Sequence, residues 1–407
     1  MNKNRNKSKQ KADTPPERVI GLDNHPDSFT AAFLIGREAN EAKVLRIQDK
    51  VRQDRFEAWL QEHTTERDVI VMEASANSFA AVEAAKSHGR RAVVLESAQC
   101  AKLGESYCAS DRSDAVKLGR LYISGLPKKV WVPDQTTRLR REVFYAHRQA
   151  VTDSTRCRQR IRGFLNQHRI RLEKGFKVTS QSGLAQILAL RQWEPTQQLL
   201  LIQYHGALRE AHLRRQQLRE VMAQEILKEP SILRLIRLCG LRHITAFALA
   251  AFIGDITRFA NPKKLVTYIG VNPSVCDSGE TKGPTHLRNN GCAPLRALMI
   301  QAAQAILRTP GAAFAKWGHQ LAIRRGRNRA AVGVARKLVT AVWYCLSGQF
   351  TMLEEVPAMV TYKLGLLISA LGSLRDRNFA GESPEVYKTR MLETIQHSHT
   401  LVFRSGV

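Results

Sequence analysis

The first third of the chain alternates short apolar runs with stretches in which apolar residues recur at helical spacing. The runs with strand character are residues 18–23, 28–36, 44–48, 68–73 and 91–96, and the helical stretches are residues 56–63, 79–88 and 113–122. The turn at residues 24–27 predicts that the first two strands form a hairpin. Three strands followed by helix, strand, helix, strand and helix is the element order of a ribonuclease-H-like fold. We therefore expect an α/β domain of this fold over residues 18–134.

The middle of the chain, residues 135–228, has the pattern of a basic coiled coil. Apolar residues recur at heptad-like spacing in residues 138–172 and along one side of residues 195–228. The first series is Leu139, Val143, Ala146, Ala150, Cys157, Ile161 and Phe164, and the second is Leu201, Tyr204, Leu208, Ala211, Leu218 and Met222. This pattern indicates an antiparallel hairpin or a dimerising coiled coil that also contacts phosphate backbones. A solvated helical spacer is the alternative interpretation.

The last part of the chain is predicted to be mainly α-helical. Residues 229–348 hold an apolar run at 244–254, a second helical segment and a polar loop that carries Ser278. No apolar run reaches the roughly 18 to 20 residues that a membrane helix requires, so we expect no membrane partner. Residues 349–407 form an extension without a motif that predicts its role. Residues 1–17 are a basic tail, expected to be disordered, without the apolar segment of a secretory signal.

The charge balance indicates a polyanionic partner. The chain has 63 Lys and Arg against 36 Asp and Glu, a net charge of +27, and the cations are spread along its whole length. An excess of this kind is typical of nucleic-acid-binding proteins. The seven cysteines include no Cys-x-x-Cys pair, which indicates reduced thiols in the cytosol and argues against a zinc site.

Four acidic residues stand at informative places in the predicted α/β domain. Asp23 lies late in the first strand and Glu73 ends the fourth, while Asp111 and Asp114 are spaced so that both project from one face of a helix start. Carboxylates at strand ends of an α/β sheet converge on one crevice, and oxygen ligands alone favour Mg²⁺ or Mn²⁺. Two such ions stabilise the attacking and leaving oxygens of a phosphodiester displacement. Taken singly, Asp111 is also a candidate helix N-cap and Glu73 a candidate surface charge.

Ser278 is the candidate nucleophile, because it lies in a Gly-containing loop between cations. Its attack on a DNA phosphate gives a phosphoserine ester, so strands can be rejoined without ATP. The alternative is that the loop is an ordinary turn without a catalytic serine, in which Asp277 makes an Asx-turn rather than acting as a base. Ser274 is the fallback hydroxyl. The candidate nucleic-acid contacts are Arg138, Arg141, Arg148, Arg156 and Arg160 in the coiled coil and Arg242, Lys282, Arg288 and Arg296 beyond it.

These residues resemble the insertion-sequence 110/1111 transposases, relatives of the Piv and MooV DNA invertases. Asp23, Glu73, Asp111 and Asp114 resemble that family's DEDD tetrad, within the blocks at residues 72–75 and 110–115. Further similarity lies in residues 239–246, 253–259, 268–270, 278–279, 295–296 and 330–346. The chain departs from the family at residues 239–242, where a Pro-Gly-x-Gly turn is usual, and at residues 287–291, where a Lys-x-Gly-Asn loop is usual.

The resemblance implies a ribonuclease-H/RuvC-like domain, a coiled coil, and a second domain whose serine joins the acids. It also implies recombination of the element's own DNA, guided by a structured non-coding RNA (a bridge RNA) that the element encodes. A homo-oligomer, dimer or tetramer, would bring two DNAs together in a bacterial or archaeal cytoplasm, associated with the nucleoid. Two other hypotheses stay open: a RuvC-like nuclease, invertase or junction resolvase that uses metal-activated water, and a non-catalytic nucleic-acid-binding scaffold.

Overall fold

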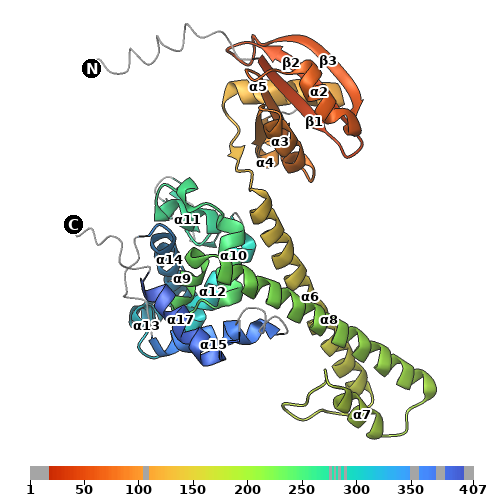
Figure 1. Cartoon of the computed structure of the whole chain (residues 1–407), viewed down its shortest axis with the longest axis vertical. Helices are drawn as coiled ribbons and strands as arrows, with labels where there is room; N and C mark the ends of the chain where they lie inside the picture. The colour runs from red at the N-terminus through yellow and green to blue at the C-terminus, as the bar shows by residue number, and fades with distance from the viewer. Residues whose placement is uncertain are drawn as a thin grey trace. The chain divides into compact units, whose positions relative to one another are not determined.

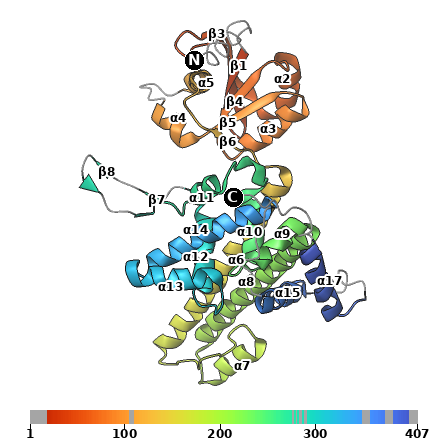
Figure 2. The ribbon, with the colours of Figure 1, turned by 90° about the vertical axis from the view of Figure 1, so that its left-hand side faces the viewer.

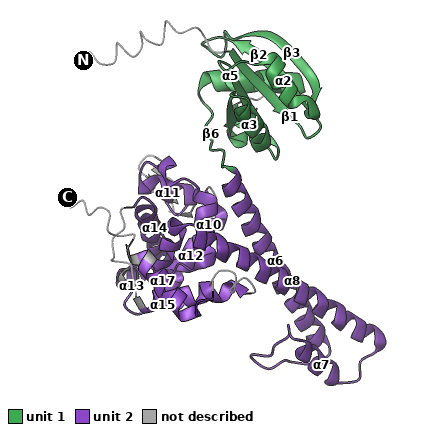
Figure 3. Ribbon diagram, viewed as in Figure 1, with its two compact units in different colours: residues 1–134 green, residues 135–407 purple. Residues whose placement is uncertain are grey.

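The protein consists of two compact units, each described here by itself. The computed structural model describes residues 18–103, 110–274, 277–278, 281–282, 286–287, 291–348, 357–372 and 381–397. Unit 1 comprises residues 1–134 and unit 2 comprises residues 135–407 (Figure 3). No helix among the described residues is long and apolar enough to cross a membrane.

Unit 1 is built on a mixed six-stranded sheet (Figure 1). Its strand order is β3-β2-β1-β4-β5-β6. The strands are β1 (Arg18–Asn24), β2 (Ser28–Ile35), β3 (Lys43–Arg52), β4 (Val69–Glu73), β5 (Arg91–Leu95) and β6 (Lys129–Val130). The first three strands pair antiparallel, β1, β4 and β5 run parallel, and β6 returns antiparallel to β5. The prediction of an N-terminal α/β domain is therefore confirmed.

Helices cover both faces of this sheet because the strands alternate their side chains between two cores. The helices are α2 (Phe56–His63), α3 (Ser78–Ser87), α4 (Ser97–Leu103) and α5 (Asp111–Ser124). Ile20 and Leu22 of β1 face α2 and α3, where Trp59 is buried. Val19 faces the opposite core, together with Leu118 of α5. Odd-numbered positions of β1 therefore point towards α5.

Helix α5 lies against β1 at a distance that only glycine permits. A Cβ atom at Gly21 would lie 1.9 Å from the backbone oxygen of Ala115 and 2.8 Å from the nitrogen of Gly119. A contact this close to backbone atoms cannot be relieved by moving a side chain. The glycine thus brings the helix onto the strand and sets the first turn of α5 above the end of β1.

Unit 2 begins with a long helical hairpin. Helix α6 (Gln135–Gln167) packs along α8 (Pro195–Lys228), and the shorter α7 (Gln181–Ala189) lies between them in the chain (Figure 1). Arg140 near the start of α6 pairs with Glu225 and Glu229 at the end of α8, so the two helices are antiparallel. The seam is therefore formed within one chain.

The predicted seam is wrong at Leu139 and Ala146 in the first half of α6. Leu139 is 53% exposed and Ala146 is exposed, whereas Phe144 and His147 are buried. Burial lowers the pKa of His147 to about 4, so its imidazole is neutral within the core at physiological pH. The apolar pattern failed here because polar residues take seam positions, as His205 and Glu220 also do in α8.

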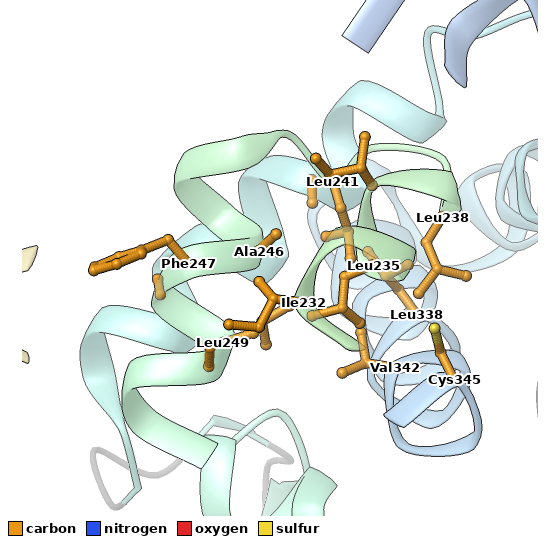
Figure 4. Packing of buried hydrophobic residues seen from close by; sticks show 14 of the residues in the cluster. Ile232, Leu235, Leu238, Leu241, Ala246, Phe247, Leu249, Leu338, Val342 and Cys345 are labelled. Atoms are coloured by element: carbon orange, nitrogen blue, oxygen red, sulfur yellow. The ribbon is translucent and has the colours of Figure 1, made fainter. Parts of the chain in front are cut away.

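The remainder of unit 2 is a helical domain around one large core. Its elements are α9 (Pro230–Arg234), η2 (Leu235–Arg237), α10 (His243–Ile253), η3 (Ile256–Arg258), α11 (Pro262–Ile269), α12 (Ala293–Ile306), α13 (Ala313–Arg325), α14 (Arg327–Leu346), α15 (Pro357–Ala370) and α17 (Pro384–His397). Figure 4 shows Leu235 and Leu241 packed with Leu338 and Val342 of α14. Helix α10 is almost wholly buried, which explains why its apolar residues show no single face.

The C-terminal segment contributes directly to this core. Leu364 and Leu367 of α15 and Ile395 of α17 are buried in the same cluster as α10. Two buried cations complete the contact: Lys363 Nζ donates to the Leu238 oxygen at 2.8 Å, and Arg237 Nη1 donates to the Ile395 oxygen at 3.1 Å. The extension that the sequence left without a role therefore stabilises unit 2.

Candidate functional site

The parallel pairing of β1 and β4 places two of the predicted acids at adjacent strand ends. The last paired residues are Leu22 and Met72, so Asp23 and Glu73 each follow one residue later in the same register. Gly21 faces α5, and side chains alternate along a strand, so Asp23 points to that same face. Glu73 is exposed at the end of β4.

The first turn of α5 supplies the other two acids. The N-cap is Ser110, whose hydroxyl accepts from the Ser113 amide at 3.2 Å while the Ser113 hydroxyl accepts from the Ser110 amide at 2.9 Å. Asp111 and Asp114 lie within the first turn, where the helix dipole favours negative charge. The alternative that Asp111 serves as the cap is therefore wrong, and its carboxylate is available for another task.

A bond across the sheet holds this helix start in place. Arg112 Nε donates to Asp49 Oδ2 of β3 at 2.8 Å, and the Thr30 hydroxyl donates to Asp49 Oδ1 at 2.8 Å. Thr30 is the pairing partner of Asp23 on β2. The aspartates of α5 are thus tied through Asp49 to the strand that borders Asp23.

Three side chains converge at this point: Asp23, His25 and Asp111. His25 Nε2 lies 3.2 Å from Asp23 Oδ2 and 3.8 Å from Asp111 Oδ1. One ligand atom from each residue lies within 4.8 Å of the others. Among the described residues, these three side chains form the group that is compact enough to hold a metal ion. The sequence reasoning missed His25, although its place two residues after Asp23 was a usable signal.

The electrostatics of the group indicate a site that gains from a cation. Burial raises the pKa of Asp23, His25 opposes the rise, and the charges of Asp111 and Asp114 add to it. A cation at this point would relieve both the burial and the repulsion between carboxylates. The carboxylate oxygens of this group fit Mg²⁺ or Mn²⁺.

Glu73 and Asp114 lie outside the compact group. The Asp114 carboxylate is 3.9 Å from Lys117 Nζ on the same helix. The charge of Glu73 contributes, after burial, to raising the pKa of the Cys100 thiol to about 11. Two acids of the predicted tetrad are therefore brought together with a histidine, and the other two flank them.

A groove lies beside α5 and includes one of these acids, Asp114. It has a volume of about 700 Å³, and its lining includes Asp114 and three cations of α5, Arg112, Lys117 and Arg120. Cations beside a carboxylate cluster are the arrangement that accepts a phosphate backbone next to bound metal.

Ser278 belongs to unit 2 and lies on β8 (Asp277–Ser278), which pairs with β9 (Thr281–Lys282). The structure describes the backbone of these strands but not the side chains of Ser274, Asp277, Ser278 and Lys282. Arg288 lies outside the described residues. Strand β7 (Pro273–Ser274) pairs with β10 (His286–Leu287), and Figure 2 shows β7 and β8 extending from the helices of unit 2.

The base of this segment is held by a contact between two glycines. Gly291 has φ +99°, and a Cβ there would lie 2.9 Å from the Cα of Gly270. The Cys292 amide donates to the Tyr268 oxygen at 2.8 Å. Gly270 and Gly291 thus lie side by side in the helical body.

The predicted cationic contacts occupy different environments. Arg141 Nε donates to the Ala251 oxygen at 2.9 Å at the end of α10, which gives it a structural role. Arg148, Arg156 and Arg160 are exposed on α6, and Arg138 and Arg296 are half-buried. Arg242 is exposed before α10.

The turn at residues 239–242, which departs from the family's usual Pro-Gly-x-Gly, packs closely against another helix of unit 2. A Cβ at Gly240, which has φ +81°, would lie 2.6 Å from the Ala302 oxygen of α12. This glycine therefore packs the turn onto α12.

An arginine cluster at the turn between α13 and α14 was missed. Arg324, Arg325, Arg327 and Arg329 are exposed around Gly326, and none forms an ion pair with a carboxylate in the described part of the chain. Arg327 borders a hollow of about 440 Å³ with Arg308 and His319. The signal was in the sequence, because no acidic residue occurs between Glu280 and Glu354.

Comparison with known proteins shows similarity to transposases, and the family model matches a part of unit 2. The family model described as "Transposase IS116/IS110/IS902 family" matches residues 233–317. The transposase for insertion sequence element IS1111A of Coxiella burnetii is 34% identical over 28% of this chain and 32% of its own length. The y4qE protein of Sinorhizobium fredii, named as a candidate transposase, is 24% identical over 57% of this chain and 56% of its own length. The chain thus spans about half of one relative and about a third of the other.

Proposed function

We propose that this chain, which belongs to the IS116/IS110/IS902 family of transposases, cleaves and rejoins DNA strands at the ends of an insertion sequence. The observation that carries the proposal is the convergence of Asp23 and Asp111 at the end of β1, flanked by Glu73 and Asp114. Carboxylates this close together repel one another unless a cation binds between them. The arrangement is therefore better explained by a cation site than by ordinary surface charges.

The proposed fold of unit 1 is ribonuclease-H/RuvC-like. Its support is the strand order, with three antiparallel strands followed by two parallel ones and helices on both faces. Carboxylates at the ends of adjacent parallel strands then form the reaction centre, as is general for α/β sheets.

The proposed chemistry is a transesterification by Ser278. Its hydroxyl oxygen attacks the phosphorus, forming a phosphoserine ester and releasing the sugar hydroxyl of the cleaved strand. Attack by a strand hydroxyl on that ester frees the serine and joins DNA without ATP. Mg²⁺ or Mn²⁺, held by Asp23 and Asp111 with Glu73 and Asp114 beside them, supplies polarisation of the phosphate when bound. Asp277 or solvent accepts the serine proton.

The proposed partners are DNA, a structured guide RNA and further copies of the chain. Exposed arginines along α6 and around Gly326 are suited to phosphate backbones of either nucleic acid. A dimer or tetramer would hold two DNAs at once, and the reaction would take place in the cytoplasm on chromosomal DNA.

The test is a cleavage assay with the full chain, its co-purifying RNA, DNA spanning the gene's flanks, and MnCl₂ or MgCl₂. We expect strand cleavage and a protein–DNA adduct that survives denaturing electrophoresis and disappears on protease treatment. Cleavage without an adduct would replace the serine mechanism by hydrolysis with metal-activated water. Absence of cleavage with every flank and cation would favour a nucleic-acid-binding scaffold.

The arginine cluster at the α13–α14 turn is expected to contact phosphates. Arg327 and Arg329 stand in the first turn of α14, where cations oppose the helix dipole, so helix stability does not account for them. In the variant Arg327→Gln/Arg329→Gln, we expect weaker DNA binding at every sequence and a salt slope lower by about 2, because each lost phosphate contact removes roughly 0.9. Fluorescence anisotropy at several salt concentrations measures this.

The control for that variant is Arg52→Gln/Arg390→Gln, which removes the same charge. These exposed arginines are paired with Asp54 and Glu382. An equal loss of affinity and slope in both variants would mean that net charge alone acts and that the cluster is no docking surface.

A further inference from the structure

His25 is the one member of the compact group that is not an acid. It follows β1 in the turn to β2, and its side chain is 52% exposed. The backbone at this position is held on both sides: the His25 amide donates to the Ser28 oxygen at 2.9 Å, and Asn77 Nδ2 donates to the His25 oxygen at 2.9 Å. The turn therefore presents the imidazole to the acids from a fixed backbone.

The distances match those around a single ion. An ion about 2.1 Å from each ligand atom sets neighbouring ligand atoms about 3 Å apart and opposite atoms about 4.2 Å apart. The separations of His25 Nε2 from Asp23 Oδ2 and from Asp111 Oδ1 are 3.2 Å and 3.8 Å. With all three ligand atoms within 4.8 Å of one another, their spacing is close to that of the ligands of one ion.

We propose that His25 is a ligand of the divalent cation in unit 1 and that it makes the site prefer Mn²⁺ to Mg²⁺. The inference rests on the proposed function in that both require a cation at Asp23 and Asp111. It goes further by giving the site a nitrogen ligand and hence a metal preference that four carboxylates alone do not supply.

The preference follows from ligand chemistry. Mg²⁺ is a hard ion that keeps oxygen ligands and its waters, and it gains little from an imidazole. First-row transition-metal ions bind imidazole nitrogen more strongly, and Mn²⁺ is the weakest of that series. A site with one imidazole among carboxylates therefore separates Mn²⁺ from Mg²⁺ without excluding either.

The competing interpretation is that His25 only pairs with the aspartates. Each interpretation gives a different result when the imidazole is removed. A pairing imidazole competes with any cation for the carboxylates, so its removal strengthens the binding of Mg²⁺ and Mn²⁺ alike. A ligand imidazole contributes to Mn²⁺ binding alone, so its removal weakens Mn²⁺ and leaves Mg²⁺ nearly unchanged.

The experiment measures Mn²⁺ and Mg²⁺ binding to the full chain by titration calorimetry at fixed pH. We expect His25→Ala to weaken Mn²⁺ binding by about tenfold and to change Mg²⁺ binding less than twofold. The control His88→Ala removes a histidine of unit 1 whose Nδ1 lies 2.8 Å from the Ala84 oxygen, and it is expected to change neither. Electron spin-echo spectroscopy of bound Mn²⁺ should show ¹⁴N coupling in the wild type and none in His25→Ala.

The results separate this inference from the proposed function. Unchanged or tighter Mn²⁺ binding in His25→Ala, with no ¹⁴N coupling in the wild type, would overturn the ligand role of His25. The cation site itself would still stand if Asp111→Asn abolished Mn²⁺ binding. Failure of the wild type to bind either cation would overturn the cation site itself and with it the proposed mechanism.

Discussion

DNA strand cleavage is expected to fall by at least about a thousandfold when Asp111 is replaced by asparagine. The amide keeps the shape of the side chain but lacks the charge that holds a cation, and metal-assisted stabilisation of the transition state is worth several kcal/mol. About 4 kcal/mol corresponds to a factor of about a thousand in rate. Single-turnover cleavage of labelled DNA, with saturating protein, measures the effect.

The matched control for Asp111→Asn is Asp27→Asn. Asp27 is an exposed aspartate in the turn after β1, close in sequence to the compact group but not part of it. We expect this variant to cleave at the wild-type rate. Neither variant should bind DNA more weakly than the wild type, because each removes a negative charge, which repels phosphate. Equal cleavage by Asp111→Asn and the wild type would remove the acid cluster from the reaction.

Replacing Ser278 by alanine is expected to abolish the covalent protein–DNA adduct completely. Alanine has no oxygen to attack phosphorus, and a water molecule in its place produces a cut strand but no ester to the protein. Denaturing electrophoresis of the reaction, followed by peptide mapping of the wild-type adduct, tests the assignment directly.

Ser274→Ala serves as the comparison, since Ser274 is the fallback serine and lies on the neighbouring short strand β7. Adducts should form at the wild-type level in this variant. Loss of the adduct in Ser274→Ala, with its retention in Ser278→Ala, would move the nucleophile to Ser274. Unaltered adducts in both variants would exclude each serine, and unaltered cleavage without any adduct would identify hydrolysis.

Much of unit 1 was predictable, because strand residues buried on both sides leave a strong apolar signal. The resemblance to insertion-sequence transposases and the α/β character of unit 1 were both confirmed. The bounds of β3 were underestimated, since this edge strand is largely exposed and its two ends, residues 43 and 49–52, are mostly polar or charged. Ser110 was read as part of a motif, and its role as the N-cap of α5 became clear only from its bonds to Ser113.

The polar members of cores and sites were harder to predict. His147, His205 and Glu220 occupy buried seam positions in α6 and α8, where a search for apolar residues passes over them. His25 was missed for a related reason: its neighbours in space, Asp23 and Asp111, come from a strand end and a distant helix start. A polar side chain has no periodic signature of its own, so its environment depends on what the fold brings to it.

By itself, the sequence determined most strands and helices of unit 1, the two long helices of the hairpin, the excess of positive charge and the candidate acids, because these depend on local pattern and composition. Only the tertiary structure decided that α5 lies directly on β1 through Gly21, that Ser110 rather than Asp111 caps it, and that His25 joins two of the acids. It also decided that α15 and α17 complete the core of unit 2. Apart from the local Ser110 cap and the His25–Asp23 contact, these contacts join residues far apart in the chain, and they depend on backbone packing distances that no local pattern encodes.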